Sequence, residues 1–215
     1  IASLSEDKNM IKAFNDNVDI HASTASKIFN VNLGEVNREQ RSNAKTVNFG
    51  IIYGVSAFGL SNQTNLTRSQ SKELIESYFD AYPDLKNYIS NQINFARENG
   101  FVETVLQRKR YLKDINSRNP MVRGAAERNA VNAPVQGSAA DIIKIAMVNI
   151  YNKICDENLK SKLLIQVHDE LIFEIHRAEI DTMTLLIKNE MEKAFKLKVP
   201  LRVDIGTGNN WFDAH

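Results

Sequence analysis

The stretch LLIQVHDELIFEI, Leu163–Ile175, places His168, Asp169 and Glu170 inside an otherwise apolar run. Desolvating an unpaired carboxylate costs several kcal/mol, so such a group normally has a partner, a metal ion or access to water. Asp favours turns, and the flanking residues favour strands. The stretch therefore predicts a β-hairpin. Two interpretations of its charged residues remain open: a turn with no further role, or a metal-ligating carboxylate at the hairpin tip.

Length and composition indicate a folded protein of unremarkable charge. The chain has 215 residues, 43% of them hydrophobic, which is enough for a buried core. Its 27 basic and 26 acidic side chains nearly balance, so net charge indicates neither a nucleic-acid nor a membrane partner. Cys155 is the only cysteine, which excludes an internal disulfide and fits a reducing compartment. No apolar run approaches the roughly 18 residues of a membrane span, and no signal peptide is evident. We expect a soluble, cytoplasmic protein.

The order of predicted elements indicates the fold class. Apolar periodicity and capping residues predict helices first, then strands with helices on one face, which is an α+β arrangement. No repeat is present, so we expect a single compact unit. The expected helices are 5–14, 19–29 (capped by Asp19), 68–82 (opened by Thr67 and Gln70, ended by Pro83), 84–99 (ended by Gly100), 122–158 (with a break near Pro134) and 181–195; strands are expected in 101–115, 163–175 and 200–208.

The segment REQRSNAKTVNFGIIYG, residues 38–54, has two cations and two aromatic residues at steps of four: Arg41, Lys45, Phe49 and Tyr53. In a helix each step of four drifts by about 40°, so all four fall within a sector of roughly 120°. Such a face can bind a triphosphate with its cations and stack a base or sugar on its rings. A helix with a solvated basic edge and a buried aromatic stripe fits the spacing as well. A strand is also open, because TVNFGIIYG carries β-branched residues and two glycines.

Basic side chains gather in residues 101–128, where seven basic residues, Arg108 and Arg110 among them, stand against three acidic ones. The local charge is +4 in a chain whose net charge is +1. A patch of this kind is what binding to a phosphate backbone requires, and the affinity should fall as salt rises. A solvated surface explains many such runs equally well.

A second series at steps of four follows in ERNAVNAPVQGSAADIIK: Arg128, Asn132 and Gln136. Asn and Gln side chains both donate and accept hydrogen bonds, which suits base edges in the minor groove. Helix packing accounts for the same spacing.

Taken together, these segments resemble the polymerase domain of family A DNA polymerases, the bacterial polymerase I type, over essentially the whole chain in order. RSNAKTVNFGIIYG is similar to the family's finger-helix motif, and ERNAVNAPVQGSAADIIK to the helix that holds primer and template. QVHDE resembles a palm motif, and GTGNNWFDAH the family's C-terminus. The resemblance implies helical fingers (about 20–115) and a partial palm (about 116–215) with an antiparallel hairpin and packed helices, with 1–19 leading out of another palm motif.

The resemblance assigns a metal role to the opening stretch. Asp169 would be one of two catalytic aspartates that hold two Mg²⁺ ions, with Glu170 as an auxiliary carboxylate and His168 touching the primer terminus. In the family the two metals stabilise the attacking and leaving oxygens of an in-line displacement.

The resemblance also assigns roles to the helix face. Arg41, Lys45 and His21 would bind the phosphates of a deoxynucleoside triphosphate, and Lys45 could protonate the pyrophosphate leaving group. Phe49 would stack near the sugar, and Tyr53 would close the pocket of the nascent base pair.

Contacts with primer-template DNA are implied for the remaining basic and amide residues. Arg128 and Gln136 would track the duplex, and Asn132 would support them. Arg108 and Arg110 belong to the basic patch, whose charge leads us to expect contacts with the DNA backbone. We therefore expect a monomeric DNA polymerase of the bacterial cytosol or nucleoid, with no membrane partner.

Two departures from the family pattern modify these expectations. Gln107 stands where the family commonly has Gly before its basic turn, so we expect a turn of different shape. The family's other catalytic Asp belongs to a motif upstream of the segment matched by IASLSEDKNM, so we expect these 215 residues alone to be inactive. The alternatives are a nucleic-acid-binding module without catalysis and, less favoured, a metal-dependent hydrolase that uses the HDE residues.

Overall fold

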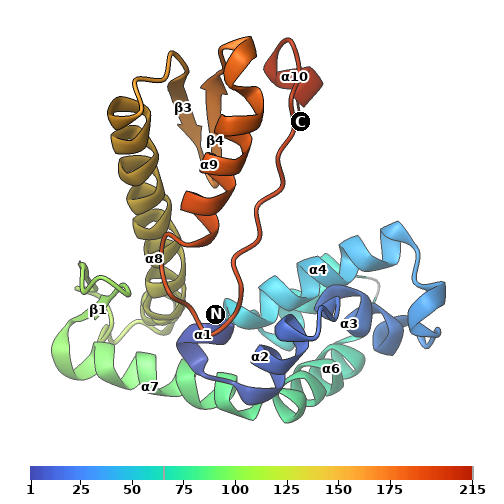
Figure 1. Cartoon of the computed structure of the whole chain (residues 1–215). Helices are drawn as coiled ribbons and strands as arrows, with labels where there is room; N and C mark the ends of the chain where they lie inside the picture. The colour runs from blue at the N-terminus through green and yellow to red at the C-terminus, as the bar shows by residue number, and fades with distance from the viewer. Residues whose placement is uncertain (65, 215) are drawn as a thin grey trace. The chain divides into compact units, whose positions relative to one another are not determined.

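The computed structural model describes residues 1–64 and 66–214 (Figure 1). His215, the last residue of the segment GTGNNWFDAH, therefore lies outside the described residues. The chain divides into two compact units: unit 1 comprises 1–103 and 109–135, and unit 2 comprises 104–108 and 136–215. Helices with two small antiparallel hairpins make up these units, which confirms the predicted α+β class.

The helices and strands follow one another in this order: α1 (Ala2–Ser5), α2 (Lys8–Asn15), α3 (Ile20–Phe29), η1 (Leu33–Glu35), α4 (Arg38–Ile52), α5 (Ala57–Gln63), α6 (Arg68–Ala81), α7 (Pro83–Asn99), β1 (Phe101–Glu103), β2 (Lys109–Tyr111), α8 (Pro120–Asp156), β3 (Lys162–Val167), β4 (Glu170–Glu174), η2 (Arg177–Glu179), α9 (Ile180–Glu192) and α10 (Trp211–Ala214).

The helix predicted for 5–14 corresponds to α2, which begins at Lys8, and a separate short helix, α1, precedes it. Glu6, with a φ of 55°, ends α1, and Asp7 starts α2 by accepting from the backbone N–H of Met10 at 2.9 Å. The second oxygen of this buried carboxylate accepts from the N–H groups of Asp84 and Leu85, at 3.0 and 3.3 Å. One side chain thus satisfies free N–H groups at the start of both α2 and α7.

The remaining capping predictions in unit 1 are confirmed. Asp19 caps α3, and Thr67 and Gln70 form a capping box at α6. Gly100, with a φ of 77°, ends α7, as its tolerance of positive φ suggests. α6 ends just before Pro83, which is the first residue of α7. A proline is tolerated at this position because the N–H it lacks would have no partner within the helix.

Residues 38–52 form a helix, which answers the question of helix or strand left open by the sequence. A capping box at Asn37 and Gln40 starts α4, and the helix buries Ala44, Val47 and Ile51. The helix packs along α3. The β-branched residues and the glycine are thus tolerated because the buried face provides most of the stability.

The core of unit 1 joins α7, the β1–β2 hairpin and the first half of α8. Its members are small or branched apolar residues: Ile93, Ala96, Val102, Leu112, Ile115, Ala126, Ala130 and Ala133. β1 and β2 pair in an antiparallel register from Phe101 opposite Tyr111 to Glu103 opposite Lys109, which confirms the strand-and-turn prediction.

The predicted break near Pro134 is wrong, because α8 continues through this residue from Pro120 to Asp156. A proline inside a helix removes one backbone hydrogen bond and costs about 3 kcal/mol. Buried residues on both sides, Ala130 and Ala133 before it and Ile143 after it, hold the helix in place despite that cost.

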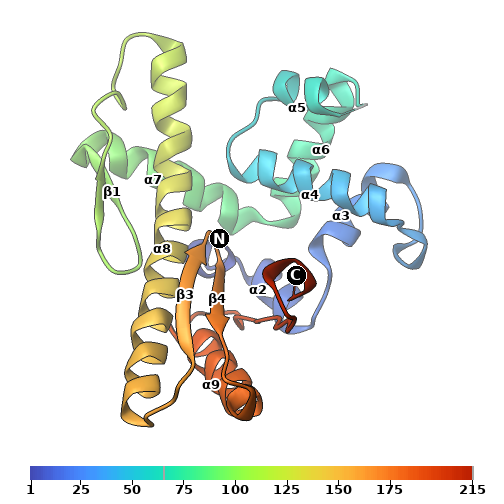
Figure 2. The same cartoon turned by 90° about the horizontal axis from the view of Figure 1, so that it is seen from above.

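In unit 2 the β3–β4 hairpin lies beside the second half of α8 and α9 (Figures 1 and 2). The helices cover one face of the hairpin with an apolar core formed by Ile150, Ile154, Met183, Leu186 and Ile187, against which Leu171 and Phe173 pack. The strands are antiparallel, with a register shift at Leu164. This confirms the hairpin predicted for 163–175.

The strand predicted for 200–208 is wrong: residues 201–208 have no regular secondary structure. A strand needs a partner strand for its backbone groups, and this segment has none among the described residues. The N–H of Val203 instead donates to the carboxylate of Glu192 at 3.3 Å. No helix in the described part of the chain is both long and apolar enough to span a bilayer.

Candidate active site

Three structural features hold many of the residues that the sequence singled out, and the others lie on α3, β2 and α8. The three features are the HDE turn (His168, Asp169 and Glu170) in unit 2, the cationic–aromatic face (Arg41, Lys45, Phe49 and Tyr53) in unit 1, and the tip of the β1–β2 hairpin (residues 104–108) in unit 2.

The HDE turn is the tight connection between β3 and β4. Val167 pairs with Glu170, so His168 and Asp169 alone form the loop. The φ of His168 is 53°, a left-handed conformation that is uncommon for a residue other than glycine. The side-chain amide of Gln166 donates to the backbone carbonyl of His168 at 3.0 Å and so helps to hold this conformation.

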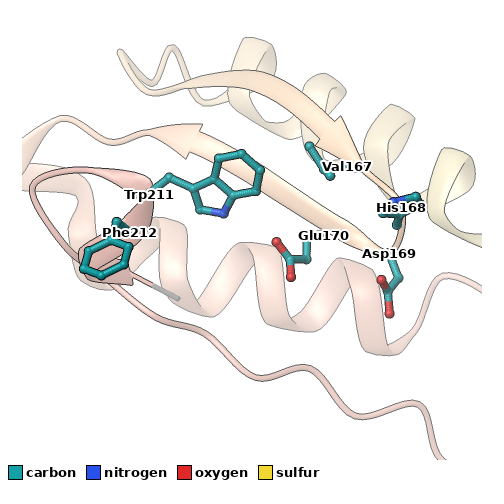
Figure 3. Close-up of a pocket in the computed structure, with 6 residues that line it drawn as sticks. All are labelled: Val167, His168, Asp169, Glu170, Trp211 and Phe212. Carbon is teal, nitrogen blue, oxygen red and sulfur yellow. The ribbon is translucent and has the colours of Figure 1, made fainter.

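A pocket of about 400 Å³ opens beside the turn (Figure 3). The carboxyl groups of Asp169 and Glu170 extend to the same side of the hairpin. The pocket is lined by the HDE turn together with Val167, Trp211 and Phe212. Two carboxylates and two large aromatic side chains therefore border one cavity, which the apolar appearance of the stretch did not reveal.

The donor chemistry of the turn fits Mg²⁺. This ion takes oxygen ligands and is commonly held by one or two carboxylates together with substrate phosphates. Asp169 is exposed and Glu170 is partly exposed, so both can reach a ligand in the pocket. No group of three or more His, Cys, Asp or Glu side chains suited to a metal occurs among the described residues. The further ligands of an ion held here would come from a substrate or from other residues.

The cationic–aromatic face is assembled as the four-residue spacing predicts. The rings of Phe49 and Tyr53 stack at a centroid distance of 6.1 Å, with 15° between their planes. The ammonium of Lys45 lies 5.9 Å from the Phe49 centroid, and Phe49 is 41% exposed. The alternative of a buried aromatic stripe is therefore wrong, because the first ring of the stripe faces solvent next to a cation.

His21 joins this face from α3. Its ring lies 5.9 Å from Phe49, and its Nδ1 lies 2.9 Å from the Nδ2 atom of Asn48. Burial lowers the pKa of His21, and the charges of Arg41 and Lys45 lower it further, while Asp19 acts in the opposite direction. The structure thus brings together all five residues predicted to bind the nucleotide.

Arg41 is held by an ion pair that the sequence did not indicate. Its Nε lies 2.5 Å from the carboxylate of Asp19, the residue that also caps α3. Burial alone would raise the pKa of Asp19, but the hydrogen bonds from Arg41 and from the Ala22 N–H, with the guanidinium charge, outweigh it and lower the pKa. Arg41 is therefore fixed on the edge of the face.

The three residues predicted to follow DNA along α8 differ in their surroundings. Arg128 is exposed, and its side chain lies against Gly54, the residue after Tyr53: a Cβ on this glycine would lie 3.5 Å from Arg128 Cγ. Asn132 is partly buried, and its Oδ1 has no hydrogen-bond partner within the described chain. Gln136 is exposed.

The tip of the β1–β2 hairpin is fixed on α8 by a polar network. Asp141, which is only 6% exposed, accepts from the Thr104 hydroxyl and from Arg108 Nε at 2.9 Å. The Val105 N–H donates to Ser138 Oγ, also at 2.9 Å. Arg108, predicted to bind DNA, is thus partly engaged within the protein.

Two further residues of the hairpin bear on the sequence predictions. Gln107 has a φ of 61°, a left-handed backbone that glycine adopts readily, and the expected difference in turn shape from the family stays a prediction. Arg110, on β2, is exposed, as a contact with DNA requires.

Several contributors to the site carried no signal in the sequence. Asn48 and Asp141 act through contacts between residues far apart in the chain, so no local pattern marks them, and the cap at Asp19 was predicted but its contact with Arg41 was not. Trp211 and Phe212 lie in a segment whose resemblance was noted, and Trp211 is the only tryptophan, a signal that could have singled it out.

The fold is that of a polymerase domain. The structure matches the POL domain of Pol1 from M. smegmatis, solved in complex with DNA primer-template and dNTP, with a TM-score of 0.94 and 44% sequence identity. The match covers 99% of this chain and 38% of that one. Residues 1–213 match the model of DNA polymerase family A, and the chain belongs to this family.

Relatives in bacteria agree with the assignment. The chain is 50% identical over 213 residues to DNA polymerase I of Caldicellulosiruptor bescii and 48% identical over 214 residues to that of Geobacillus stearothermophilus. These matches cover 99% and 100% of this chain but only 25% and 24% of those proteins. The chain therefore spans about a quarter of the length of its relatives.

Proposed function

We propose that the chain is part of a template-directed DNA polymerase, which adds deoxynucleotides to a primer 3′ end and releases pyrophosphate. The observation that carries this proposal is the presence of both the HDE turn and the cationic–aromatic face in a chain that matches the family over residues 1–213. Unit 1 would supply most of the fingers, and unit 2 would belong to the palm.

The HDE turn would serve nucleotidyl transfer through its carboxylates. Asp169 would hold Mg²⁺, with Glu170 as an auxiliary ligand, and two such ions when bound would stabilise the attacking and leaving oxygens. His168 would contact the primer terminus. Support comes from the exposure of Asp169 and from the strained turn that presents it, since unusual backbone conformations concentrate at functional sites.

The cationic–aromatic face would bind the incoming deoxynucleoside triphosphate. Arg41, Lys45 and His21 would contact phosphate oxygens, and Lys45 would donate a proton to the pyrophosphate leaving group. Phe49 would lie against the sugar, and Tyr53 would border the base pair. The stacked rings and the adjacent cations provide a surface suited to these contacts.

Basic and amide residues would bind primer-template DNA. Arg110 and Arg128 are exposed cations, which suits contacts with the phosphate backbone, and Arg108 has an exposed side chain despite its ion pair. Gln136 would reach the duplex directly, with Asn132 in a supporting position. On the same grounds as the family assignment, we propose a monomer that works in the bacterial cytoplasm.

A nucleic-acid-binding module without catalysis is the second candidate. The observation in its favour is that no three-ligand metal cluster occurs in the described part of the chain. We accordingly propose that these 215 residues do not extend a primer by themselves, and that catalysis requires another carboxylate from the longer protein.

Primer extension separates the two candidates. The full-length protein and the 215-residue chain are each assayed with primer-template, deoxynucleotides and Mg²⁺, alongside DNA binding across a salt series. Incorporation by the full-length protein that is lost on Asp169→Asn, with DNA binding retained, supports the polymerase. DNA binding without incorporation by the full-length protein supports the binding module.

A further inference from the structure

Asn48 is buried in unit 1 beneath the cationic–aromatic face. It is 1% exposed, lies on α4 next to Phe49, and its Nδ2 is 2.9 Å from Nδ1 of His21 on α3. Its Oδ1 is buried and has no hydrogen-bond partner among the described residues. A buried amide that leaves one atom unpaired makes its contact with His21 at a cost, and helix packing alone does not explain that cost.

The orientation of this amide fixes the tautomer of His21. An N–H group that donates to Nδ1 requires a lone pair there, so the ring proton resides on Nε2. The reverse orientation would turn Oδ1 toward His21 and leave the buried NH₂ group without acceptors. Unpaired buried donors are rarer in proteins than under-satisfied carbonyl oxygens, which favours the first orientation.

The surroundings of His21 favour its neutral form, for which the choice of tautomer matters. Burial lowers the pKa of His21, the charges of Arg41 and Lys45 lower it further, and Asp19 opposes them. A neutral imidazole has one N–H group only. If that group is Nε2–H, His21 can donate to a phosphate oxygen; if it is Nδ1–H, Nε2 presents a lone pair that repels the same oxygen.

We propose that Asn48 is a positioning residue that holds His21 in the neutral Nε2–H tautomer, ready to donate to a phosphate oxygen of the incoming nucleotide. Phe49 borders the His21 ring at 5.9 Å and limits its rotation. Asn48 itself does not touch the nucleotide. The phosphate half of this inference rests on the proposed polymerase function, whereas the tautomer half concerns the free protein alone.

The tautomer is measured on the full-length protein without nucleotide. The ¹⁵N shifts of the imidazole nitrogens distinguish a protonated from an unprotonated Nδ1, and the spectrum of His21→Phe identifies the resonances. Wild type should show a protonated Nε2 above pH 7. Asn48→Asp should move the proton to Nδ1, because a carboxylate can only accept. An unchanged tautomer in Asn48→Asp, or a protonated Nδ1 in wild type, would overturn the inference.

Nucleotide binding provides the functional readout. Affinity for a deoxynucleoside triphosphate is measured on a primer that lacks its 3′-hydroxyl, between pH 6 and pH 9. Asn48→Asp should bind about tenfold more weakly than wild type at pH 8, the loss of one hydrogen bond to a charged group. Its carboxylate raises the pKa of the facing His21, so binding should recover as the pH falls and the ring gains its second N–H. A pH-independent loss would overturn the positioning role.

Two further variants separate positioning from folding. Val47→Ala removes buried volume from the neighbouring position on α4, which is 1% exposed, and should reduce stability without changing the tautomer or the affinity. Asn48→Leu removes the donor while keeping an uncharged side chain, and should weaken binding without the pH-dependent recovery. If wild type binds no nucleotide, the proposed polymerase function fails. If wild type binds the nucleotide and both Asn48 variants bind it as tightly as wild type does, the inference alone fails.

Discussion

Gly137 is the residue on α8 that lets the tip of the β1–β2 hairpin approach the helix. A Cβ at this position would lie 2.6 Å from Cγ2 of Thr104, closer than real contacts allow. Thr104 cannot simply rotate away, because its hydroxyl donates to the carboxylate of Asp141. We predict that Gly137→Ala destabilises the docked tip, although alanine is the better helix former by about 1 kcal/mol.

The magnitude follows from the two opposing effects. Losing or distorting a hydrogen bond to a charged group costs about 1.5–3 kcal/mol. Subtracting the gain in helix propensity leaves a net loss of about 0.5–2 kcal/mol. In a Thr104→Ser background the stability change caused by Gly137→Ala should have the opposite sign, because serine lacks Cγ2 but keeps the hydroxyl that donates to Asp141. In the Thr104→Ser background the nearest remaining atoms, on Arg108 and Cβ of residue 104, lie 3.5 and 3.9 Å from the new methyl group, so Gly137→Ala should then stabilise.

Hydrogen exchange in the full-length protein measures this effect at the tip. The Val105 N–H donates to Ser138 Oγ at 2.9 Å and exchanges when the tip leaves α8. Its exchange should accelerate several-fold in Gly137→Ala and return to the wild-type rate or below in the double variant. Thr104→Ser alone serves as the control. Equal effects of Gly137→Ala in the wild-type and Thr104→Ser backgrounds would refute the steric explanation, since the coupling energy would then be zero.

Three more predictions follow from the sites. Asp169→Asn should lower the single-turnover rate of the full-length protein by orders of magnitude and leave DNA binding nearly unchanged, because an amide binds Mg²⁺ poorly, and Glu170→Gln should cost less; a rate within tenfold of wild type would exclude Asp169 as a metal ligand. Lys45→Ala should both raise the Kd for the nucleotide and slow the chemical step, since the lysine charge would contact phosphates that gain charge in the transition state. A change in Kd alone would show that Lys45 takes no part in the chemical step. Gln107→Gly should slow hydrogen exchange at the β1–β2 tip, because glycine removes the strain of the left-handed backbone and stabilises the folded turn by about 1 kcal/mol. Faster exchange would show that the Gln107 side chain stabilises the turn.

Local sequence patterns predicted the helices and hairpins well because their signals are local. The caps at Asp19 and Thr67 involve residues three positions away, and the structure contains both. The four-residue spacing of Arg41 to Tyr53 needs only a helix to bring the side chains to one face, and α4 provides it. What spacing could not decide was whether the rings are buried, because this depends on which side of α4 packs against α3.

The errors and omissions depend on contacts between distant parts of the chain. The alternating residues of 200–208 look like a strand, but no partner strand pairs with them among the described residues. Pro134 looks like a break, but buried residues on both sides keep the helix intact. Asp7 lies inside the helix predicted for 5–14, but in the structure it caps α2 and also serves α7, which begins 76 positions further along the chain, at Pro83.

The backbone conformations of the two hairpin turns show a further limit of sequence patterns. His168 and Gln107 both have left-handed φ angles, 53° and 61°, where glycine would be free of strain. A pattern search would place Gly or Asn at such positions and treat any other residue as evidence against a tight turn. At His168 the position in the turn accounts for the strain. Val167, the residue before it, is paired in the hairpin, and Asp169, the residue after it, lines the pocket, so the backbone must reverse direction at His168. Glycine at residue 168 would relax the turn but would also free the backbone that orients Asp169, so an expected gain in stability would come with a loss of order in the carboxylates.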